Sequence, residues 1–151
     1  AADLVGRKLI RDNGEMVNQF IDSIEQNLLD LSSYDSEVVF ELTNALKVLI
    51  TKLKKTTQLI LNDSRSDSRK PFFNSYSYLM LWGVIAGGWQ MARSAMLAEK
   101  IKLEDPDNPF YEEKLVSCLH YCRQVLPTAE SYINIIKAES LSEESLKRIF
   151  H

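Results

Sequence analysis

The sequence predicts an all-α fold, an up-and-down bundle of four main helices with short helices at its two ends. Apolar residues recur at intervals of three and four along most of the 151 residues, which is the period of helices that bury one side. Only five glycines and four prolines interrupt this pattern. A domain of this length buries about 68–70% of the surface of its unfolded chain. We therefore expect residues 1–151 to form a single helical domain.

The chain begins with a short amphipathic segment that we interpret as the end of an earlier helix. Asp12, Asn13 and Gly14 then favour a turn. A first full helix is expected from about Glu15 to Leu31. Its buried stripe is Val17, Ile21, Ile24, Leu28 and Leu31.

A longer second helix is expected from about Glu37 to Leu61, with Asp35 or Ser36 as its N-cap. Its apolar residues follow the spacing of a bundle seam: Val39, Leu42, Leu46, Leu49, Leu53, Thr56 and Ile60. Four lysines also fall on this helix and suggest an anionic ligand or, as we prefer, a solvated outer face: Lys47, Lys52, Lys54 and Lys55. Residues 62–70 lack apolar side chains and predict a loop.

The segment from Pro71 to Ala92 contains no charged residue, although Lys70 and Arg93 flank it. A membrane span, a buried strand and a buried helix are the three alternatives. The strictly apolar part is about 15 residues, whereas a bilayer needs about 20 and strands usually run about 4–8. We favour a central buried helix that starts at Pro71 and continues to about residue 100–102.

The spacing within this segment supports a helix whose apolar stripe is Tyr78, Trp82, Ile85, Trp89, Ala92 and Met96. Gly83 and Gly87 lie four residues apart beside that stripe. Each glycine costs about 1 kcal/mol relative to alanine inside a helix. Paired glycines therefore predict a place where a neighbouring backbone comes close.

After a turn at residues 104–109, Asn108 is expected to cap the next helix, with Pro109 in its first position. The apolar residues of this helix are Leu115, Leu119, Cys122, Leu126, Ala129, Ile133 and Ile136. Pro127 falls within this register, so we expect one bent helix and not two. Ser140 or Ser142 is then expected to cap a last short helix over about residues 143–150.

No constellation of residues predicts a catalytic, cofactor-binding or metal site. Cys118 and Cys122 share a helical face, but His120 points elsewhere and no second ligand pair follows. Buried thiols are the preferred interpretation, although spacing alone leaves a Cys–His catalytic pair open. A net charge of −3 gives no reason to expect nucleic acid. The residues expected to act in core packing are Tyr78, Trp82, Gly83, Ile85, Gly87, Trp89, Leu115, Leu119, Leu126 and Ile133.

Three parts of the chain resemble a known family. The opening, Asp3 to Leu9 followed by Arg11 to Gly14, resembles the junction after the catalytic region of certain acyl-CoA dehydrogenases. The central helix, with Tyr78 to Gly83, resembles their extra C-terminal domain, and so does the stretch from Asn108 to Pro127. The resemblance is to the long bacterial enzymes of the methylmercaptopropionyl-CoA dehydrogenase type.

This resemblance implies a C-terminal structural or assembly domain, with residues 1–14 as the junction and residues 15–151 as the bundle. Members of the family oxidise an acyl-CoA to the 2,3-enoyl-CoA with bound FAD and a glutamate base in an upstream Tyr-Glu-Gly-Thr segment. No catalytic residue is carried over to this chain, which is expected to be inactive alone and to hold no cofactor. The implied partners are the parent catalytic domains and further copies in a homo-oligomer, in the cytoplasm.

The alternative is a free-standing helical interaction module whose groove receives an amphipathic partner helix. A Tyr-Glu-Gly-Thr segment directly before Ala1 in the gene would favour the first hypothesis, and its absence would favour the second. If the chain is an excised part, its first ten residues are expected to dock loosely.

Overall fold

The computed structural model describes the backbone of residues 1–150 and the side chains of residues 1–140. The described residues form helices and turns without a strand, which confirms the all-α prediction. The elements in chain order are the π-helical segment η1 (Leu4–Ile10), α1 (Glu15–Ser32), α2 (Glu37–Ser66), α3 (Lys70–Phe73), α4 (Ser75–Glu104), α5 (Pro109–His120), the π-helical turn η2 (Tyr121–Val125) and α6 (Thr128–Phe150).

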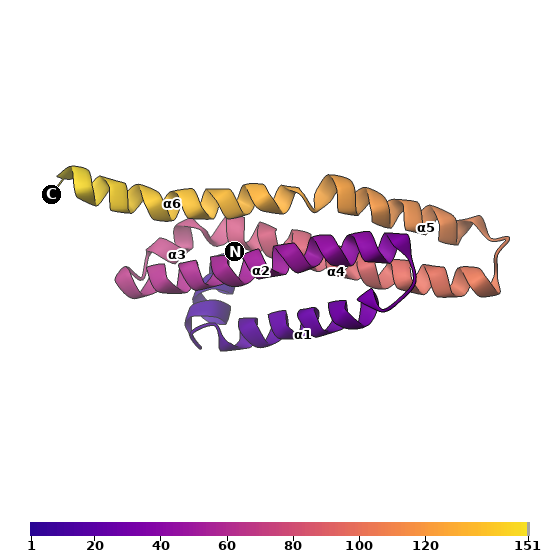
Figure 1. The fold of residues 1–151 in the computed structure, drawn as a ribbon. Coiled ribbons are helices and arrows are strands. Elements are labelled where there is room, and N and C mark those ends of the chain that lie inside the picture. Colours follow the sequence, from indigo (N-terminus) through magenta and orange to yellow (C-terminus); the bar gives the residue numbers. More distant parts are fainter. Residues whose placement is uncertain (151) are drawn as a thin grey trace.

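The long helices run alternately up and down along one axis, as expected (Figure 1). α2 and α4 pack against each other in the middle of the bundle, and both also contact α6. α1 lies on one side of this central pair, whereas α5 and α6 follow one another along the other side (Figure 1). The fourth rod of the bundle is therefore built from two helices and not from one.

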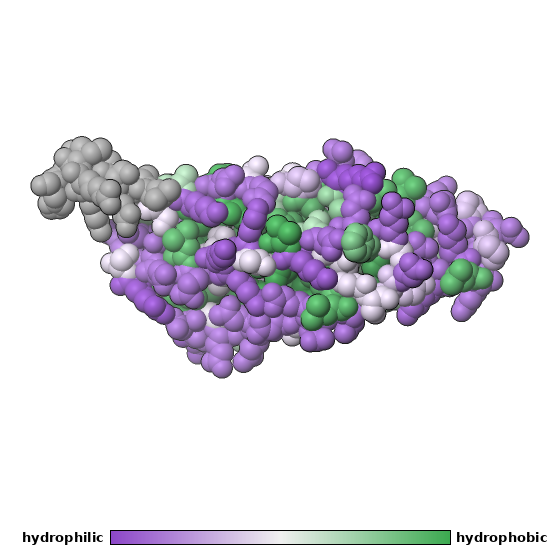
Figure 2. All heavy atoms as spheres, viewed as in Figure 1, coloured by the Kyte–Doolittle hydropathy of each residue, from purple (hydrophilic) through white to green (hydrophobic). Residues whose placement is uncertain are grey.

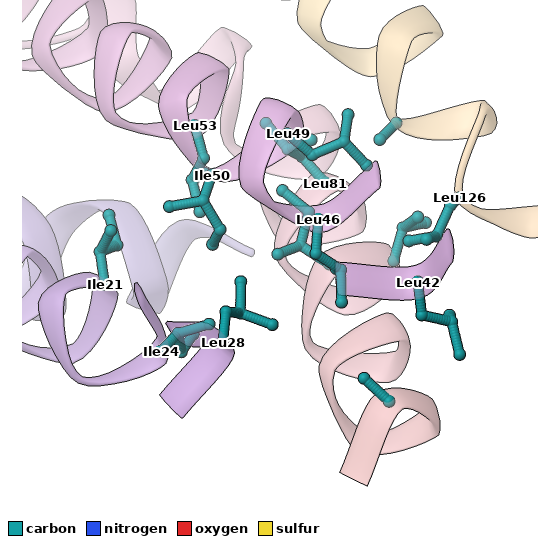
Figure 3. Close-up of a cluster of buried hydrophobic side chains, with 14 of the residues drawn as sticks. Ile21, Ile24, Leu28, Leu42, Leu46, Leu49, Ile50, Leu53, Leu81 and Leu126 are labelled. Carbon is teal, nitrogen blue, oxygen red and sulfur yellow. The ribbon is translucent and has the colours of Figure 1, made fainter. Parts of the chain in front are cut away.

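Side chains from every long rod meet in one apolar core. The stripe predicted for α1 is buried, and Ile21, Ile24 and Leu28 are fully so. Figure 3 shows these α1 residues facing side chains of α2, together with Leu81 and Leu126. Full burial of each such side chain contributes about 1.5–3 kcal/mol relative to exposure, so the core is the main source of stability.

The turn predicted at residues 12–14 is present and caps α1. Asn13 and Gly14 adopt left-handed backbone angles, with φ of 57° and 81°. The Asp12 carboxylate accepts hydrogen bonds from the backbone N–H of Gly14 (3.1 Å) and of Met16 (3.0 Å). A Cβ at Gly14 would lie 2.7 Å from Leu61 Cδ1, so both conformation and space favour glycine here.

The N-terminal segment packs more closely than expected. Val5 and Leu9 are fully buried, and η1 contacts α1, α2, α3 and α4. A Cβ at Gly6 would lie 3.2 Å from the Phe72 ring. The expectation of loose docking is therefore not supported, because the apolar side of η1 reaches the same core as α2 and α4.

The predicted boundary between the second and central helices is wrong in two ways. α2 continues through most of the expected loop to Ser66, where hydrogen bonds of its polar side chains take the place of an apolar stripe. The hydroxyl groups of Ser64 and Ser66 donate to the carbonyls of Leu61 and Asp63. The central segment is also interrupted: α3 ends at Phe73, and α4 begins after the buried residue Asn74.

The chain from residue 108 onward departs from the expected bent helix. Asn108 caps α5 as predicted, with its side chain accepting from Phe110 N–H at 3.1 Å. Pro127 has no N–H for the carbonyl of Arg123. The preceding turn widens instead, and Leu126 N–H donates to the carbonyl of Tyr121 at 3.0 Å. α6 then restarts at Thr128.

A separate short helix at the C-terminus is not found, since the backbone of α6 is continuous from Thr128 to Phe150. Ser140 does not cap a helix there. Its hydroxyl donates to the Asp63 carboxylate on α2, at 2.9 and 3.1 Å. The side chain of Ser142, the other expected cap, lies outside the described residues.

The glycines of α4 do not act as a pair. Gly83 is exposed, and a Cβ built there would meet nothing within 4 Å, so the expected close packing at this position is wrong. At Gly87 a Cβ would collide with the side chain of Tyr121, whose hydroxyl donates to the Val84 carbonyl at 2.9 Å. The approaching group is therefore a phenol ring and not a backbone. Gly88, which the spacing argument did not select, leaves room for Leu46 and Leu126.

These surroundings predict opposite effects of the same substitution at two positions. Gly83→Ala should stabilise the fold by about 0.5–1 kcal/mol, because a helix interior favours alanine and the space is open. Gly87→Ala should destabilise it by about 1–3 kcal/mol through overpacking against Tyr121. Thermal unfolding of both variants measures the difference. Tyr121→Phe is the control, because Gly87→Ala should cost less when the hydroxyl is absent.

Candidate docking surface

An aromatic cluster lies where α1 crosses α4. The rings of Phe20 and Trp82 stack with centroids 5.7 Å apart, and Phe20 meets Trp89 edge to face at 5.9 Å. Tyr78 approaches Trp82 in the same edge-to-face manner at 6.4 Å. Such pairs contribute about 0.5–1.5 kcal/mol beyond the area they bury. Phe20, which had no role in the sequence-based prediction, is therefore the residue that joins α1 to the aromatic stripe of α4.

The polar atoms of this cluster are partly satisfied. Tyr78 and Thr57 share a buried hydrogen bond of 2.8 Å, and Trp89 Nε1–H donates to Asn27 Oδ1 at 2.7 Å. Burial raises the pKa of Tyr78, and the hydrogen bond with Thr57 opposes this shift. The indole N–H of Trp82 lies close enough to the phenol to oppose the rise in its pKa as well, although it makes no hydrogen bond of good geometry. One buried polar atom of the cluster, Trp82 Nε1, is therefore left unsatisfied.

A groove runs between α1 and α4 and is continued by η1. Its lining is almost wholly apolar and consists of Leu4, Lys8, Met16, Val17, Phe20, Leu79 and Trp82. Met16 is 58% exposed, Phe20 44% and Leu79 41%. Isolated apolar residues on a surface are ordinary, and several are visible among polar ones in Figure 2. A continuous apolar groove is more informative, because it indicates a binding surface.

α4 explains why this face is apolar. The helix has no polar side between Ser75 and Gln90 apart from hydroxyl groups, and helices that are apolar all round are normally buried all round. α2, α5 and α6 cover most of α4. Tyr76 (63% exposed), Leu79 and Gly83 remain uncovered. The uncharged segment, predicted from sequence to be a central buried helix, thus keeps one open apolar side.

A basic rim borders the groove. A second hollow, lined by Arg7, Lys8, Arg11, Asp12 and Met16, shares Lys8 and Met16 with it. Arg7 pairs with Asp3 at 2.8 Å, and the Asp12 carboxylate caps α1. Lys8 and Arg11 are exposed and form no ion pair with another described residue. The rim therefore offers unneutralised positive charge beside an apolar surface.

The residues predicted to act in packing fall into three groups. Tyr78, Ile85, Leu115, Leu126 and Ile133 are buried. Trp82, Gly87, Trp89 and Leu119 are half-buried, and Gly83 is exposed. The two tryptophans thus lie at the edge of the core, and Trp82 forms part of the wall between the core and the groove.

Comparison with known proteins assigns the chain to a family. Residues 14–145 match the family described as Acetyl-CoA dehydrogenase C-terminal like. The chain belongs to this family. It is also 29% identical over 129 residues to 3-methylmercaptopropionyl-CoA dehydrogenase of Ruegeria pomeroyi, covering 83% of this chain. The matched region spans about a fifth of that relative, 21% of its length. The resemblance noted in the sequence is thereby confirmed.

Two of the four α2 lysines link helices of this acyl-CoA dehydrogenase C-terminal domain, whereas Lys55 is exposed, as expected of a solvated face. Lys54 reaches α1, where it pairs with Glu25 at 2.5 Å and Asp22 at 3.0 Å, and Lys52 pairs with Glu130 of α6. The hydrogen bond with Glu25 is the main reason that the pKa of Lys54 is raised. Exposed ion pairs of this kind usually contribute less than about 1 kcal/mol. They therefore affect the alignment of α1, α2 and α6 more than the stability of the fold.

The two cysteines are free and buried, in agreement with the preferred interpretation. Cys118 Sγ lies 3.9 Å from Met91 Sδ, and His120, between the cysteines in sequence, is exposed. Burial raises the pKa of both thiols. Within residues 1–140 no three His, Cys, Asp or Glu side chains gather as metal ligands would. His151 lies outside the described residues.

None of the described helices combines the length and the apolar character that crossing a membrane requires.

Removal of the Phe20 ring should expose the aromatic wall. Phe20→Ala is expected to lower stability by about 0.5–1.5 kcal/mol beyond the loss of buried area, and to shift the tryptophan emission to longer wavelength as water reaches Trp82. Fluorescence and denaturant unfolding measure the two effects. Phe40→Ala is the matched control, because Phe40 is 60% exposed and lies on α2. An unchanged emission spectrum in Phe20→Ala would contradict the stacking.

The burial of the thiols predicts low reactivity. At pH 7.5 a soluble maleimide should leave Cys118 and Cys122 largely unmodified in the folded chain, because thiolate is scarce and access is closed. Both should react rapidly in denaturant. Peptide mass spectrometry measures modification at each site, and rapid labelling of Cys118 in the folded protein would show that the α4–α5 contact opens.

Proposed function

We propose that this chain is a structural and assembly domain of a cytoplasmic, FAD-dependent acyl-CoA dehydrogenase that converts an acyl-CoA to its 2,3-enoyl-CoA. In this proposal the catalytic base and the flavin site belong to other parts of the protein. The domain packs against those parts and contributes to a homo-oligomer. Membership of the family and the match to a dehydrogenase from Ruegeria pomeroyi support the assignment.

The observation that carries the proposal is the uncovered apolar side of α4. Tyr76, Leu79 and Gly83 expose a helix side that carries no charge. Exposure of such a surface is unfavourable in water, and covering it stabilises an assembly. A helix that is apolar all round is therefore suited to contact with a further protein surface.

The titratable groups support a structural role as well. Hydrogen bonding to Arg123 lowers the pKa of Glu41, whose side chain Arg123 contacts at 2.8 and 2.9 Å on the surface. Hydrogen bonding to Arg69 likewise lowers the pKa of Asp67 to about 2. These shifts arise from surface ion pairs away from the groove. General acid–base catalysis needs a titratable group within reach of a substrate, and neither of these two ion pairs lines the groove.

A free-standing interaction module is the second candidate. The α1–α4 groove favours it, since an apolar trough between helices accepts the apolar side of a partner helix. The upstream reading frame discriminates the two candidates. A flavoenzyme-like region with a Tyr-Glu-Gly-Thr segment supports the dehydrogenase domain, and an unrelated or absent upstream region supports the module.

The proposal predicts that FAD binding and acyl-CoA oxidation require parts of the protein beyond this chain. The purified chain should bind no stoichiometric FAD and should not oxidise an acyl-CoA, whereas the full gene product should do both. Flavin absorbance and reduction of an artificial electron acceptor by octanoyl-CoA measure these properties. Stoichiometric FAD and turnover in the isolated chain would contradict the proposal, and so would a full gene product without flavin.

A further inference from the structure

We infer that the α1–α4 groove is the docking site for the catalytic part of the same polypeptide, and that the docked surface is an apolar ridge flanked by acidic side chains. This inference rests on the proposed function and adds the place and the chemistry of the contact. Three features carry it: the position of the groove next to the N-terminal segment, its apolar walls and its basic rim.

The first feature is proximity. Leu4 and Lys8 of the N-terminal segment form part of the groove lining. An extended chain spans at most about 3.6 Å per residue, so a catalytic part joined ahead of Ala1 would be held close to the groove. Tethering of this kind raises the effective concentration of a partner to the millimolar range. A modest interface is then sufficient to keep the groove covered.

The second feature is the nature of the walls. Met16 and Phe20 project from α1, and Leu79 projects from α4. The α4 wall carries no charge near the groove. An apolar ridge fills such a trough, because the contact removes apolar surface of both partners from water.

The third feature is charge. Lys8 and Arg11 are exposed on the rim, whereas Asp3 pairs with Arg7 and Asp12 accepts hydrogen bonds from two backbone N–H groups. Electrostatic complementarity to these positive charges therefore predicts acidic residues on the docked surface.

The same charge pattern disfavours a second copy of this chain. A two-fold interface uses one patch twice, so a second copy would bring the same positive rim to the contact. Asp12 is the acidic residue among those lining the two hollows, and its carboxylate is already bound to backbone N–H groups. Like charges placed opposite each other are a known barrier to wrong pairing.

Site-specific thiol labelling tests the inference. Leu79→Cys places a thiol in the groove, and Leu103→Cys places one near the far end of the same helix, where Leu103 is 80% exposed. Each variant is made in the isolated chain and in the full gene product, and maleimide labelling is followed at the peptide level. We expect the Leu79→Cys thiol to react at least about tenfold more slowly in the full gene product, since burial controls thiol access. The Leu103→Cys thiol should react equally in both proteins.

The charge component is tested in the full gene product with Lys8→Glu combined with Arg11→Glu. This pair of changes should restore much of the labelling of Leu79→Cys and leave that of Leu103→Cys unchanged. Restoration by the conservative pair Lys8→Arg and Arg11→Lys would overturn the charge argument, and so would continued protection in the Glu variant.

Two further outcomes would overturn the inference. Equal labelling of Leu79→Cys in both proteins would show that the groove stays open. Protection in the isolated chain that increases with concentration would identify a second copy as the occupant. Flavin content separates these failures from failure of the proposed function: a full gene product that contains FAD but leaves the groove open refutes the docking site alone, whereas one without FAD refutes both.

Discussion

The structure depends on one constraint: α4 is apolar on nearly all sides and must be surrounded. α2 packs along it, α5 and α6 cover a second side, and α1 covers a third side only in part (Figure 1). Tyr78, Leu81, Ile85 and Gly88 follow one another at intervals of three and four residues and face the interior on one broad stripe. Because several neighbours pack on this helix, its surface fixes the positions of all of them.

A few polar contacts determine how the helices slide and rotate against α4. Thr57 of α2 bonds to Tyr78, Asn27 of α1 bonds to Trp89, and Tyr121 bonds to the carbonyl of Val84. Tyr121 fits there because Gly87 has no side chain. A buried polar group that loses its partner costs about 1–3 kcal/mol, so a shift of one helix by a turn would be penalised at several places at once.

The same packing separates two kinds of surface. On the α5–α6 side, the shared core closes over α4. On the α1 side, Phe20 bridges to the tryptophans, and beyond it Leu79 and Gly83 are left in contact with water. The C-terminal domain of a much longer relative is a natural place for such an uncovered face, because a domain within a larger protein needs a surface for its neighbours.

The sequence by itself determined the helical class and the alternating order of the long rods, because the apolar period is local. It also determined the cap at Asn108 and the turn at Asn13–Gly14, because these depend on the backbone preferences of single residues. The extension of α2 to Ser66 and the break at Asn74 depend on contacts made by polar residues, which carry no apolar period. Glycine spacing likewise selected Gly83, which meets no neighbour, and missed Gly88, which does. The spacing shows where a helix lacks side chains, but only the neighbouring side chains, here Leu46 and Leu126, decide which of these spaces is filled. The groove likewise required tertiary structure, since Phe20 and Leu79 are 59 residues apart and nothing local to either of them indicates that they line one surface.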